Sequence, residues 1–257
     1  MGAPDGQLSV EFFGEVAAWF ADPANWSGPD GVPTRIGEHL ILSVIPLVIA
    51  VAIALPIGAW IGHTGRFTSL AINVANVGRA IPSLAILAAV AIVSQQFIVS
   101  LGLRSIASEI ATITALVALA IPPILTNTYV GISEVDRQLV EAGRGMGMKD
   151  GQVLRQIEIP IGLPVILVGV RTAAVQIVAT ATLGAVVATD GLGRYIIDGL
   201  AQRRNDEIFA GALIVALLSI ATELTFTVIQ KRATSPGLRR PAISMREPGQ
   251  SGRPVGI

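Results

Sequence analysis

The sequence predicts an all-α integral membrane protein with about five transmembrane helices. Of its 257 residues, 52% are hydrophobic and only 14% are charged, and the mean hydropathy is +0.66. About a quarter of the residues in a water-soluble domain are charged, so this chain has too few charges to cover a surface in water. Aromatic residues make up only 5%. The many small apolar residues suit helices that pack closely in a bilayer.

Five stretches of the chain are long and apolar enough to cross a bilayer. The clearest is 40–61, which has no charge and would span about 33 Å at the helical rise. The other four are 70–94, 106–132, 164–189 and 207–230. Several prolines lie inside these spans, and we expect kinks or broken turns at four of them: Pro46, Pro56, Pro82 and Pro122.

The chain divides into three parts around the membrane region. Residues 1–39 are expected to form an extracytoplasmic or interfacial segment, 40–232 the transmembrane part, and 233–257 a disordered cytoplasmic tail rich in Pro, Gly and Arg. Within the first part, 8–20 predicts a short amphipathic helix with its aromatic side in the membrane interface and its acidic side in water. No basic start followed by an apolar run is present, so no cleavable signal peptide is expected.

The positions of Lys and Arg predict that the N-terminus lies outside and the C-terminus in the cytoplasm. On this topology eleven of the 18 Lys and Arg residues lie in inner segments and five in outer ones, while Arg79 and Arg171 lie inside spans. The net charge is zero. It therefore gives no reason to expect a polyanionic partner such as a nucleic acid.

The longest inner connection, residues 133–163, predicts two short amphipathic helices joined by a glycine. Helical spacing over 135–146 places three residues on one apolar side: Leu139, Val140 and Met146. Gly147 suits a left-handed helix stop, and a second helix from 149 is expected to end before Pro160. An apolar helix side held in water indicates a groove on a partner protein.

This connection resembles a motif of the binding-protein-dependent ABC permeases. The motif reads EAA, three residues, Gly, nine residues and Ile-x-Leu-Pro, and this chain has Glu141-Ala142-Gly143, then Gly147, then Ile157-x-Ile159-Pro160. It departs twice, since Gly143 replaces the second Ala and Ile159 replaces Leu. In that family the segment is the coupling helix, which docks in a cleft of the ATP-binding subunit. The resemblance thus implies ATPase coupling by Glu141, Ala142, Gly143, Gly147, Ile157 and Pro160.

The resemblance covers about 40–231 and implies the fold of a type I importer permease. Three further stretches look like the glycine betaine, carnitine and choline subfamily: GRAIPSLAIL at 78–87, RTAAVQIVATATLGAVV at 171–187 and GLGRYIIDGL at 191–200. A permease of an osmoprotectant importer in a bacterial or archaeal plasma membrane is implied. Its expected partners are an ATP-binding cassette subunit, a second permease subunit (identical or related) and a separate extracytoplasmic binding protein.

Motifs for chemistry within the chain itself are missing. There is no G-x-x-x-x-G-K-[ST] sequence, so ATP must be bound by a partner and no cofactor is expected here. There is no Cys and no nucleophile or zinc motif, so neither a catalytic centre nor a metal site is predicted. The two histidines, His39 and His63, are interpreted as residues of the membrane interface. The alternatives are a self-sufficient secondary transporter or channel, which predicts a duplication of spans that is not seen, and a membrane-embedded enzyme.

Charged and polar residues inside the spans are the remaining candidates. Arg171 and Glu223 both lie about 10 Å from the inner side of the membrane, which predicts a buried pair with Arg79 near it. The alternative is three unrelated groups. Five other polar residues either line a translocation path or form interhelical hydrogen bonds of about 1 kcal/mol each: Asn73, Asn76, Gln176, Thr180 and Thr182.

Overall fold

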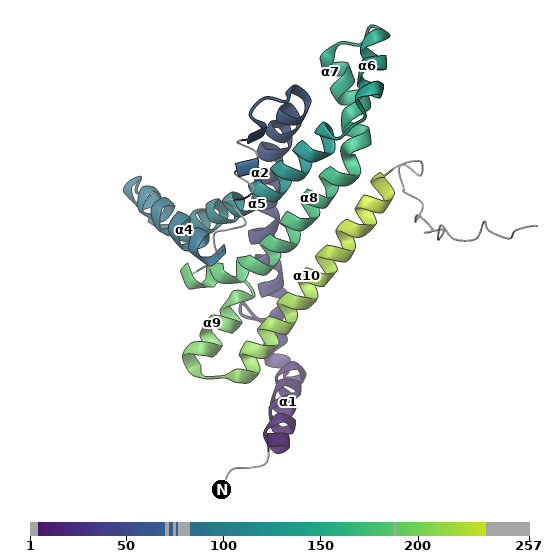
Figure 1. Ribbon diagram of the computed structural model, residues 1–257. Coiled ribbons are helices and arrows are strands. Elements are labelled where there is room, and N and C mark those ends of the chain that lie inside the picture. The colour runs from purple at the N-terminus through teal and green to yellow at the C-terminus, as the bar shows by residue number, and fades with distance from the viewer. Residues whose placement is uncertain (1–4, 70–71, 74–75, 77–82, 188, 235–257) are drawn as a thin grey trace, which may run out of the picture.

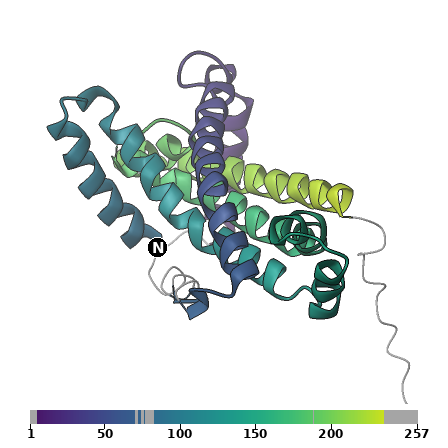
Figure 2. The same cartoon turned by 90° about the horizontal axis from the view of Figure 1, so that it is seen from above.

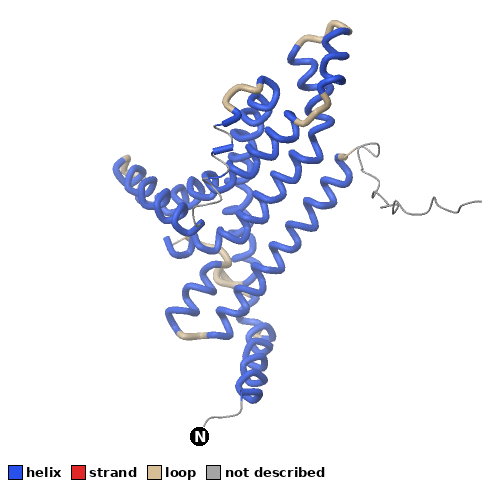
Figure 3. The backbone as a smooth tube through the Cα atoms, viewed as in Figure 1, coloured by secondary structure: helices blue, strands red, loops and turns tan. Residues whose placement is uncertain are grey.

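The described part of the chain is a bundle of helices joined by short loops (Figure 3). The computed structural model describes residues 5–69, 72–73, 76, 83–187 and 189–234, and no strand occurs among them. The α-helices are α1 (Asp5–Ala21), α2 (Val32–Thr64), α4 (Ser83–Ser100), α5 (Ala107–Ser133), α6 (Arg137–Gly145), α7 (Asp150–Val153), α8 (Ile159–Thr180), α9 (Gly193–Gln202) and α10 (Asn205–Ala233). In the described ranges there are also three short 3-10 helices, η1 (Pro23–Trp26), η2 (Arg104–Ile106) and η4 (Ala181–Val187), and one π-helical turn, η3 (Leu154–Glu158).

Four helical segments in the described ranges are long and apolar enough to cross a membrane: Val32–Thr64, Ala107–Ser133, Asp150–Val186 and Asn205–Ala233. They correspond to four of the five predicted spans, so the predicted all-α membrane fold is confirmed. The other prediction, 70–94, overlaps α4, which ends at Ser100 rather than at residue 94. Much of its first half, with Arg79 and Pro82, lies outside the described residues, as does the predicted tail beyond residue 234.

The helices α2, α5 and α8 form the centre of the bundle, and α10 lies along α8 (Figure 1). The helix α4 packs on α5, and the two project together from the side of the bundle, as the view from above shows (Figure 2). The short helices α6 and α7 stand at one end, whereas α1 and α9 stand at the other (Figure 1). The two ends therefore present different short helices to the surroundings.

Small residues let the three central helices approach closely. Their shared core contains several fully buried alanines: Ala50, Ala54, Ala115, Ala120 and Ala173. The tightest approach is between Gly131 of α5 and Gly162 of α8, since a Cβ added to Gly162 would lie 2.4 Å from the carbonyl oxygen of Gly131. A backbone oxygen cannot rotate away. Glycine is therefore required at position 162, in the manner of small residues between membrane helices.

The helix that the sequence predicts to end before Pro160 continues into α8, so that prediction is wrong. Helix α7 passes into the π turn η3, and α8 follows directly from Ile159. The wider π turn leaves Pro160 in the first turn of α8, where a nitrogen without a hydrogen is tolerated. At Pro46, Pro56 and Pro122 the helices α2 and α5 continue without a broken turn, so at these three positions a kink stays the prediction.

The helix α1 confirms the predicted N-terminal helix and packs on the bundle through aromatic side chains. Phe12 meets Phe209 of α10 edge to face at 5.4 Å between ring centroids, and Trp19 meets Tyr195 of α9 at the same distance. The acidic residues of its other side are exposed: Glu11 and Glu15. Trp19 is buried. The aromatic side is thus partly covered by protein, whereas the sequence predicted that it would face the membrane interface.

Candidate functional site

The connecting segment, residues 133–163, places its two short helices beyond the end of the central helices (Figure 1). Asp136 caps α6, because its side chain accepts a hydrogen bond of 2.9 Å from the N–H of Gln138. Helix α6 ends at Gly145, and Gly147 has a φ of +86°, in the left-handed region. The predicted helix and its glycine stop are both confirmed.

One side of α6 is left uncovered by the described residues. Leu139 is 49% exposed and Met146 78% exposed. Glu141 and Ala142, the first two residues of the EAA-like motif, are exposed as well. Val140 is half-buried, so only part of the predicted apolar side faces outward. A short helix that exposes large apolar side chains beside a carboxylate has the chemistry of a contact surface for another protein.

Gly143, the third residue of that motif, faces inward and is buried. A Cβ added to it would lie 2.6 Å from Cδ1 of Ile157 in the π turn η3. The replacement of alanine by glycine at this position therefore lets α6 lie directly on Ile157. Four of the six predicted coupling residues form two groups, an inner contact of Gly143 with Ile157 and an outer surface with Glu141 and Ala142.

The structure adds a contact that the sequence analysis missed, between His63 and Glu158. Nδ1 of His63, in the last turn of α2, donates a hydrogen bond of 2.6 Å to Oε2 of Glu158, at the end of η3. Their side chains are only 12% and 7% exposed. The sequence analysis interpreted His63 as a residue of the membrane interface and did not predict this partner. The sequence signal that could have found it is a carboxylate placed one residue after Ile157, on the turn before a span.

A polar cavity of about 660 Å³ lies between the end of α2, the end of α5 and α6. Nine of its lining residues are polar or charged: His63, Thr64, Thr68, Tyr129, Ser133, Arg137, Glu141, Arg144 and Glu158. The cavity therefore places Glu141 of the EAA-like motif and the buried His63–Glu158 pair around one space. Together they form a single site at the α6 end of the bundle.

The predicted pair of Arg171 and Glu223 is in contact. Nε of Arg171 lies 3.4 Å from Oε1 of Glu223, and its Nη1 donates to Thr227 and Gln230 of α10 at 3.2 and 3.4 Å. The two charged side chains are 27% and 45% exposed. The expected burial is thus not reached within a single chain, because α8 and α10 cover the pair from one side only. Arg79, the third predicted member, lies outside the described residues.

The five polar residues proposed as path-lining lie in different surroundings. Thr180 is buried, Gln176 is half-buried, and Thr182 donates a hydrogen bond of 2.8 Å to the carbonyl oxygen of Ala179. Asn73 and Asn76 are helical and exposed. No hydrogen bond within the described ranges joins one of these five to another. Their role on a translocation path stays a prediction.

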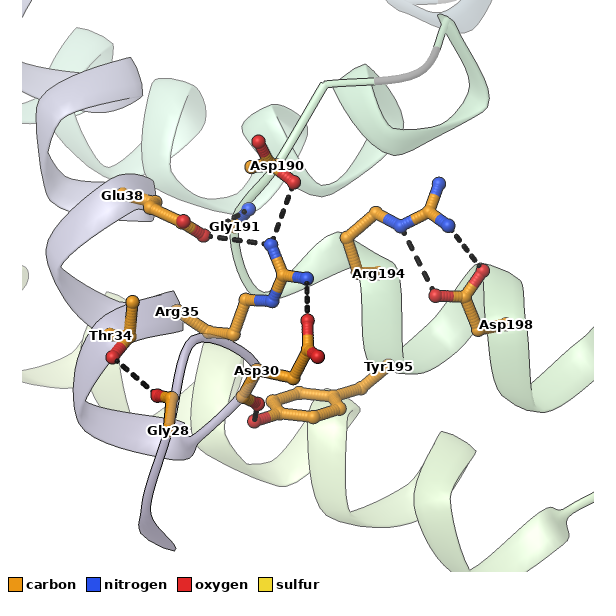
Figure 4. Close-up of polar contacts among 10 residues, drawn as sticks. All are labelled: Gly28, Asp30, Thr34, Arg35, Glu38, Asp190, Gly191, Arg194, Tyr195 and Asp198. Carbon is orange, nitrogen blue, oxygen red and sulfur yellow. Dashed lines mark hydrogen bonds and ion pairs between the residues drawn. The ribbon is translucent and has the colours of Figure 1, made fainter. Parts of the chain in front are cut away.

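The opposite end of the bundle holds a second polar cluster, around Arg35 (Figure 4). Nη1 of Arg35 forms ion pairs with Glu38 at 2.9 Å and with Asp190 at 2.7 Å, and Nη2 forms one with Asp30 at 2.5 Å. Glu38 also accepts a hydrogen bond of 3.1 Å from the N–H of Gly191. Arg35 therefore ties the start of α2 to the loop before α9, residues 155 positions apart in the chain.

Two neighbouring groups strengthen this cluster. The hydroxyl of Tyr195 donates a hydrogen bond of 2.6 Å to the carbonyl oxygen of Asp30 (Figure 4). Burial raises the pKa of that hydroxyl to about 12, which keeps it protonated as a donor at neutral pH. His39, one helical turn below Arg35, is fully buried and lies 2.9 Å from the carbonyl oxygen of Val178. The sequence analysis interpreted His39 as a residue of the membrane interface, whereas the structure shows its side chain enclosed by protein.

Residues 40–235 match the family described as the binding-protein-dependent transport system inner membrane component. The match takes in the connecting segment and most of the four membrane-length helices. The chain belongs to this family. The protein is thus a multi-pass permease subunit of an ABC importer, and the resemblance based on residues 141–160 is confirmed.

Characterised members of the family support this assignment. The glycine betaine/carnitine/choline transport system permease protein OpuCB of Bacillus subtilis is 34% identical over 205 residues, covering 80% of this chain and 89% of the relative. The carnitine transport permease protein OpuCB of Listeria monocytogenes is 36% identical over 203 residues, covering 79% and 88%. The osmoprotectant import permease protein OsmW of Salmonella typhimurium is 30% identical over 206 residues, covering 79% and 91%.

The fold is also that of a solved importer permease. An inward-facing structure of the MetNI methionine ABC transporter contains a chain that matches with a TM-score of 0.64 at 19% identity. The match covers 83% of this chain and 99% of that one. At this identity the likeness is one of fold.

Proposed function

We propose that this permease subunit carries small osmoprotectants with a quaternary ammonium group, such as glycine betaine, carnitine or choline. The support is the set of relatives at 30–36% identity whose names specify these compounds or osmoprotectants as a class. A separate extracytoplasmic binding protein delivers the substrate. The permease binds no cofactor and performs no chemistry of its own, since a partner ATPase binds and hydrolyses ATP.

The observation that carries the mechanism is the surface of α6. Glu141 and Ala142 lie exposed beside Leu139 and Met146, on a helix that Gly143 holds against the π turn η3. We assign this surface to docking in the ATPase subunit, so that ATP-driven motion enters the permease there. The α6 end is then cytoplasmic and the Arg35 end is outside. This orientation agrees with the excess of Lys and Arg in the predicted inner segments.

A second permease subunit completes the path. Helix α10 has little of its apolar surface covered within the chain. The Arg171–Glu223 pair, which joins α8 to α10, is partly exposed. A charged pair at membrane depth needs a protein or aqueous neighbour. We therefore place this side of α8 and α10 against the second subunit or the path, and not against lipid.

The test is purification in detergent with the partner subunits co-expressed, followed by an ATPase assay of the purified complex. The wild-type chain should bring down an ATP-binding subunit. Glu141→Ala and Gly147→Asp should lose that subunit or its stimulated hydrolysis, because one removes the exposed carboxylate and the other strains a left-handed backbone. Glu11→Ala, an exposed acid on α1, is the matched control and should behave as wild type.

Substrate is tested on the reconstituted complex with its binding protein. Uptake of labelled glycine betaine, carnitine or choline should require ATP and be reduced by the unlabelled compounds. Transport of none of the three would contradict the substrate proposal. Purification of the wild-type chain alone, with uptake that needs no ATP, would instead favour a secondary transporter.

A further inference from the structure

The hydrogen bond between His63 and Glu158 joins the first membrane-length helix to the connecting segment. The two residues are 95 positions apart, and their contact distance is 2.6 Å. Among the described residues, no other hydrogen bond or ion pair links α2 to residues 137–158. Both side chains are largely excluded from water. Such a hydrogen bond to a carboxylate is among the stronger ones, and each group has little contact with solvent to replace its partner.

Glu158 occupies the last position of the π turn η3, next to Ile157. A π turn is a rare element, and it rotates the side chains that follow relative to an α-helix. Here the two neighbours point to different elements: Ile157 lies against Gly143 of α6, whereas Glu158 reaches His63 of α2. The turn is therefore the junction at which α6, α2 and α8 meet.

Below this junction the helices α2 and α5 pack closely. A Cβ added to Gly62, next to His63, would lie 2.7 Å from Cβ of Ile132 in α5. The cavity of about 660 Å³ lies on the other side, with His63 and Glu158 both in its wall. Helix α2 thus packs closely against α5 but faces open space toward α6. The buried pair is the polar contact that bridges this space.

We propose that His63 and Glu158 are positioning residues that transmit movement of α6 to α2 during transport. A displacement of α6 moves Ile157 through its contact with Gly143. The π turn then carries Glu158 with it, and the hydrogen bond moves the end of α2. This inference rests on the proposed docking of α6 in the ATPase, and it assigns to His63 a role in coupling.

The test compares variants of His63 in the complete complex with ATPase and binding protein, measuring assembly, ATP hydrolysis and uptake. His63→Leu removes the donor, while His63→Asn keeps an amide nitrogen near the position of Nδ1. We expect His63→Leu to assemble and hydrolyse ATP but to lower the number of substrates carried per ATP about tenfold, as befits loss of a hydrogen bond to a charged group. His63→Asn should retain most of the wild-type ratio.

Two controls alter neighbours that do not join α2 to η3. Thr64→Val removes a hydroxyl that donates to the carbonyl oxygen of Trp60 in α2 and accepts from the N–H of Arg66, and neither bond reaches η3. Gln156→Ala removes an exposed side chain from the same π turn. Both should keep the wild-type ratio of uptake to hydrolysis. If they lowered it as much as His63→Leu does, the pair would have no special role and the proposal would be overturned.

An exchange of the two residues covers the case in which His63→Leu does not accumulate. His63→Glu alone sets two carboxylates together and should abolish coupled uptake, whereas His63→Glu with Glu158→His restores a donor and an acceptor and should recover it. A wild-type ratio in His63→Leu, or no recovery in the exchanged chain when His63→Asn also fails, overturns the proposal. Both outcomes differ from failure of the proposed function, in which the wild-type chain itself binds no ATPase.

Discussion

The two ends of the bundle are fastened in different ways. At the α1 and α9 end, Arg35 forms ion pairs with three carboxylates, and two of these are well exposed, Asp30 at 81% and Asp190 at 66%. At the α6 end, the buried pair of His63 and Glu158 is the polar link from α2 to the connecting segment in the part of the chain that the structure describes. The α1 and α9 end is therefore held by several ion pairs, whereas the α6 end depends on few polar contacts.

This difference shows that the effect of losing one contact depends on how exposed it is and on how many other contacts hold the same segments together. Arg35 is only 11% exposed, but its carboxylate partners reach water, so each pair contributes little and the other pairs compensate for the loss of one. The buried pair of His63 and Glu158 has little access to water and, among the described residues, no neighbouring ion pair that could compensate for its loss. The Arg35 end therefore suits a platform that keeps its shape. The α6 end, where α6, η3 and the end of α2 meet, suits a joint at which a single contact transmits motion between helices.

The largest expected effect comes from breaking the tight packing below that joint. Gly162→Ala sets a methyl group 2.4 Å from the carbonyl oxygen of Gly131, so α5 and α8 must separate. We expect a loss of about 3 kcal/mol in the free energy of unfolding, the upper part of the range for overpacking. Thermal unfolding of the purified chain in detergent measures it.

Gly37→Ala in α2 is the matched control for that substitution. A Cβ there meets no atom within 4 Å, and the residue is helical. Alanine should therefore leave stability unchanged or raise it by up to about 1 kcal/mol. Equal destabilisation by both substitutions would show that glycine at position 162 has no special packing role.

The next effect concerns the opposite end. Arg35→Gln removes the cation from all three carboxylates and should cost about 1–2 kcal/mol, because hydrogen bonds to charged groups are lost but exposed partners regain water. The loop before α9 should become more accessible to protease while α6 keeps its coupling. Limited proteolysis beside a stimulated ATPase assay checks both. A loss of ATPase binding in this variant would contradict the separation of the two ends.

A smaller effect tests the inner contact of the joint. Gly143→Ala restores the alanine of the EAA pattern but places Cβ 2.6 Å from Cδ1 of Ile157, a flexible side-chain end that can move. We expect a cost of about 1 kcal/mol. Ile157→Val removes that methyl group and should recover most of the loss in the double variant. Additive effects in thermal unfolding would mean that the two residues do not interact.

Sequence reasoning found what depends on local pattern. The spans, the helix over α6 and the glycine stop at Gly147 follow from periodicity and turn chemistry, and counting helical rise brought Arg171 near Glu223. The family followed from the spacing of the EAA-like motif. Each of these is encoded within one segment or in two regular helices, so no knowledge of packing is needed.

What sequence reasoning missed depends on tertiary structure. Nothing near His63 in the chain indicates Glu158, because 95 residues separate them. The stop predicted at Pro160 assumed an α-helical hydrogen-bond register, and the π turn before it changes that register. The contact of Gly131 with Gly162 is equally hidden, since several other glycines occur in helices without such a neighbour. The Arg35 cluster needs three separate segments to fold together.

The smallest expected effect sharpens the contrast between the ends. Asp190→Asn removes one of three carboxylates from Arg35, but the amide keeps an acceptor oxygen, and Asp30 and Glu38 remain. We expect a change below about 0.5 kcal/mol, the level of an exposed pair. Glu38→Gln should cost more, because Glu38 is less exposed and also accepts the N–H of Gly191. Thermal unfolding should therefore rank Asp190→Asn, Glu38→Gln and Arg35→Gln in increasing order of destabilisation. If Asp190→Asn destabilised the protein as much as Arg35→Gln, the cluster would depend on a single contact. The two ends of the bundle would then not differ in the number of contacts that hold them.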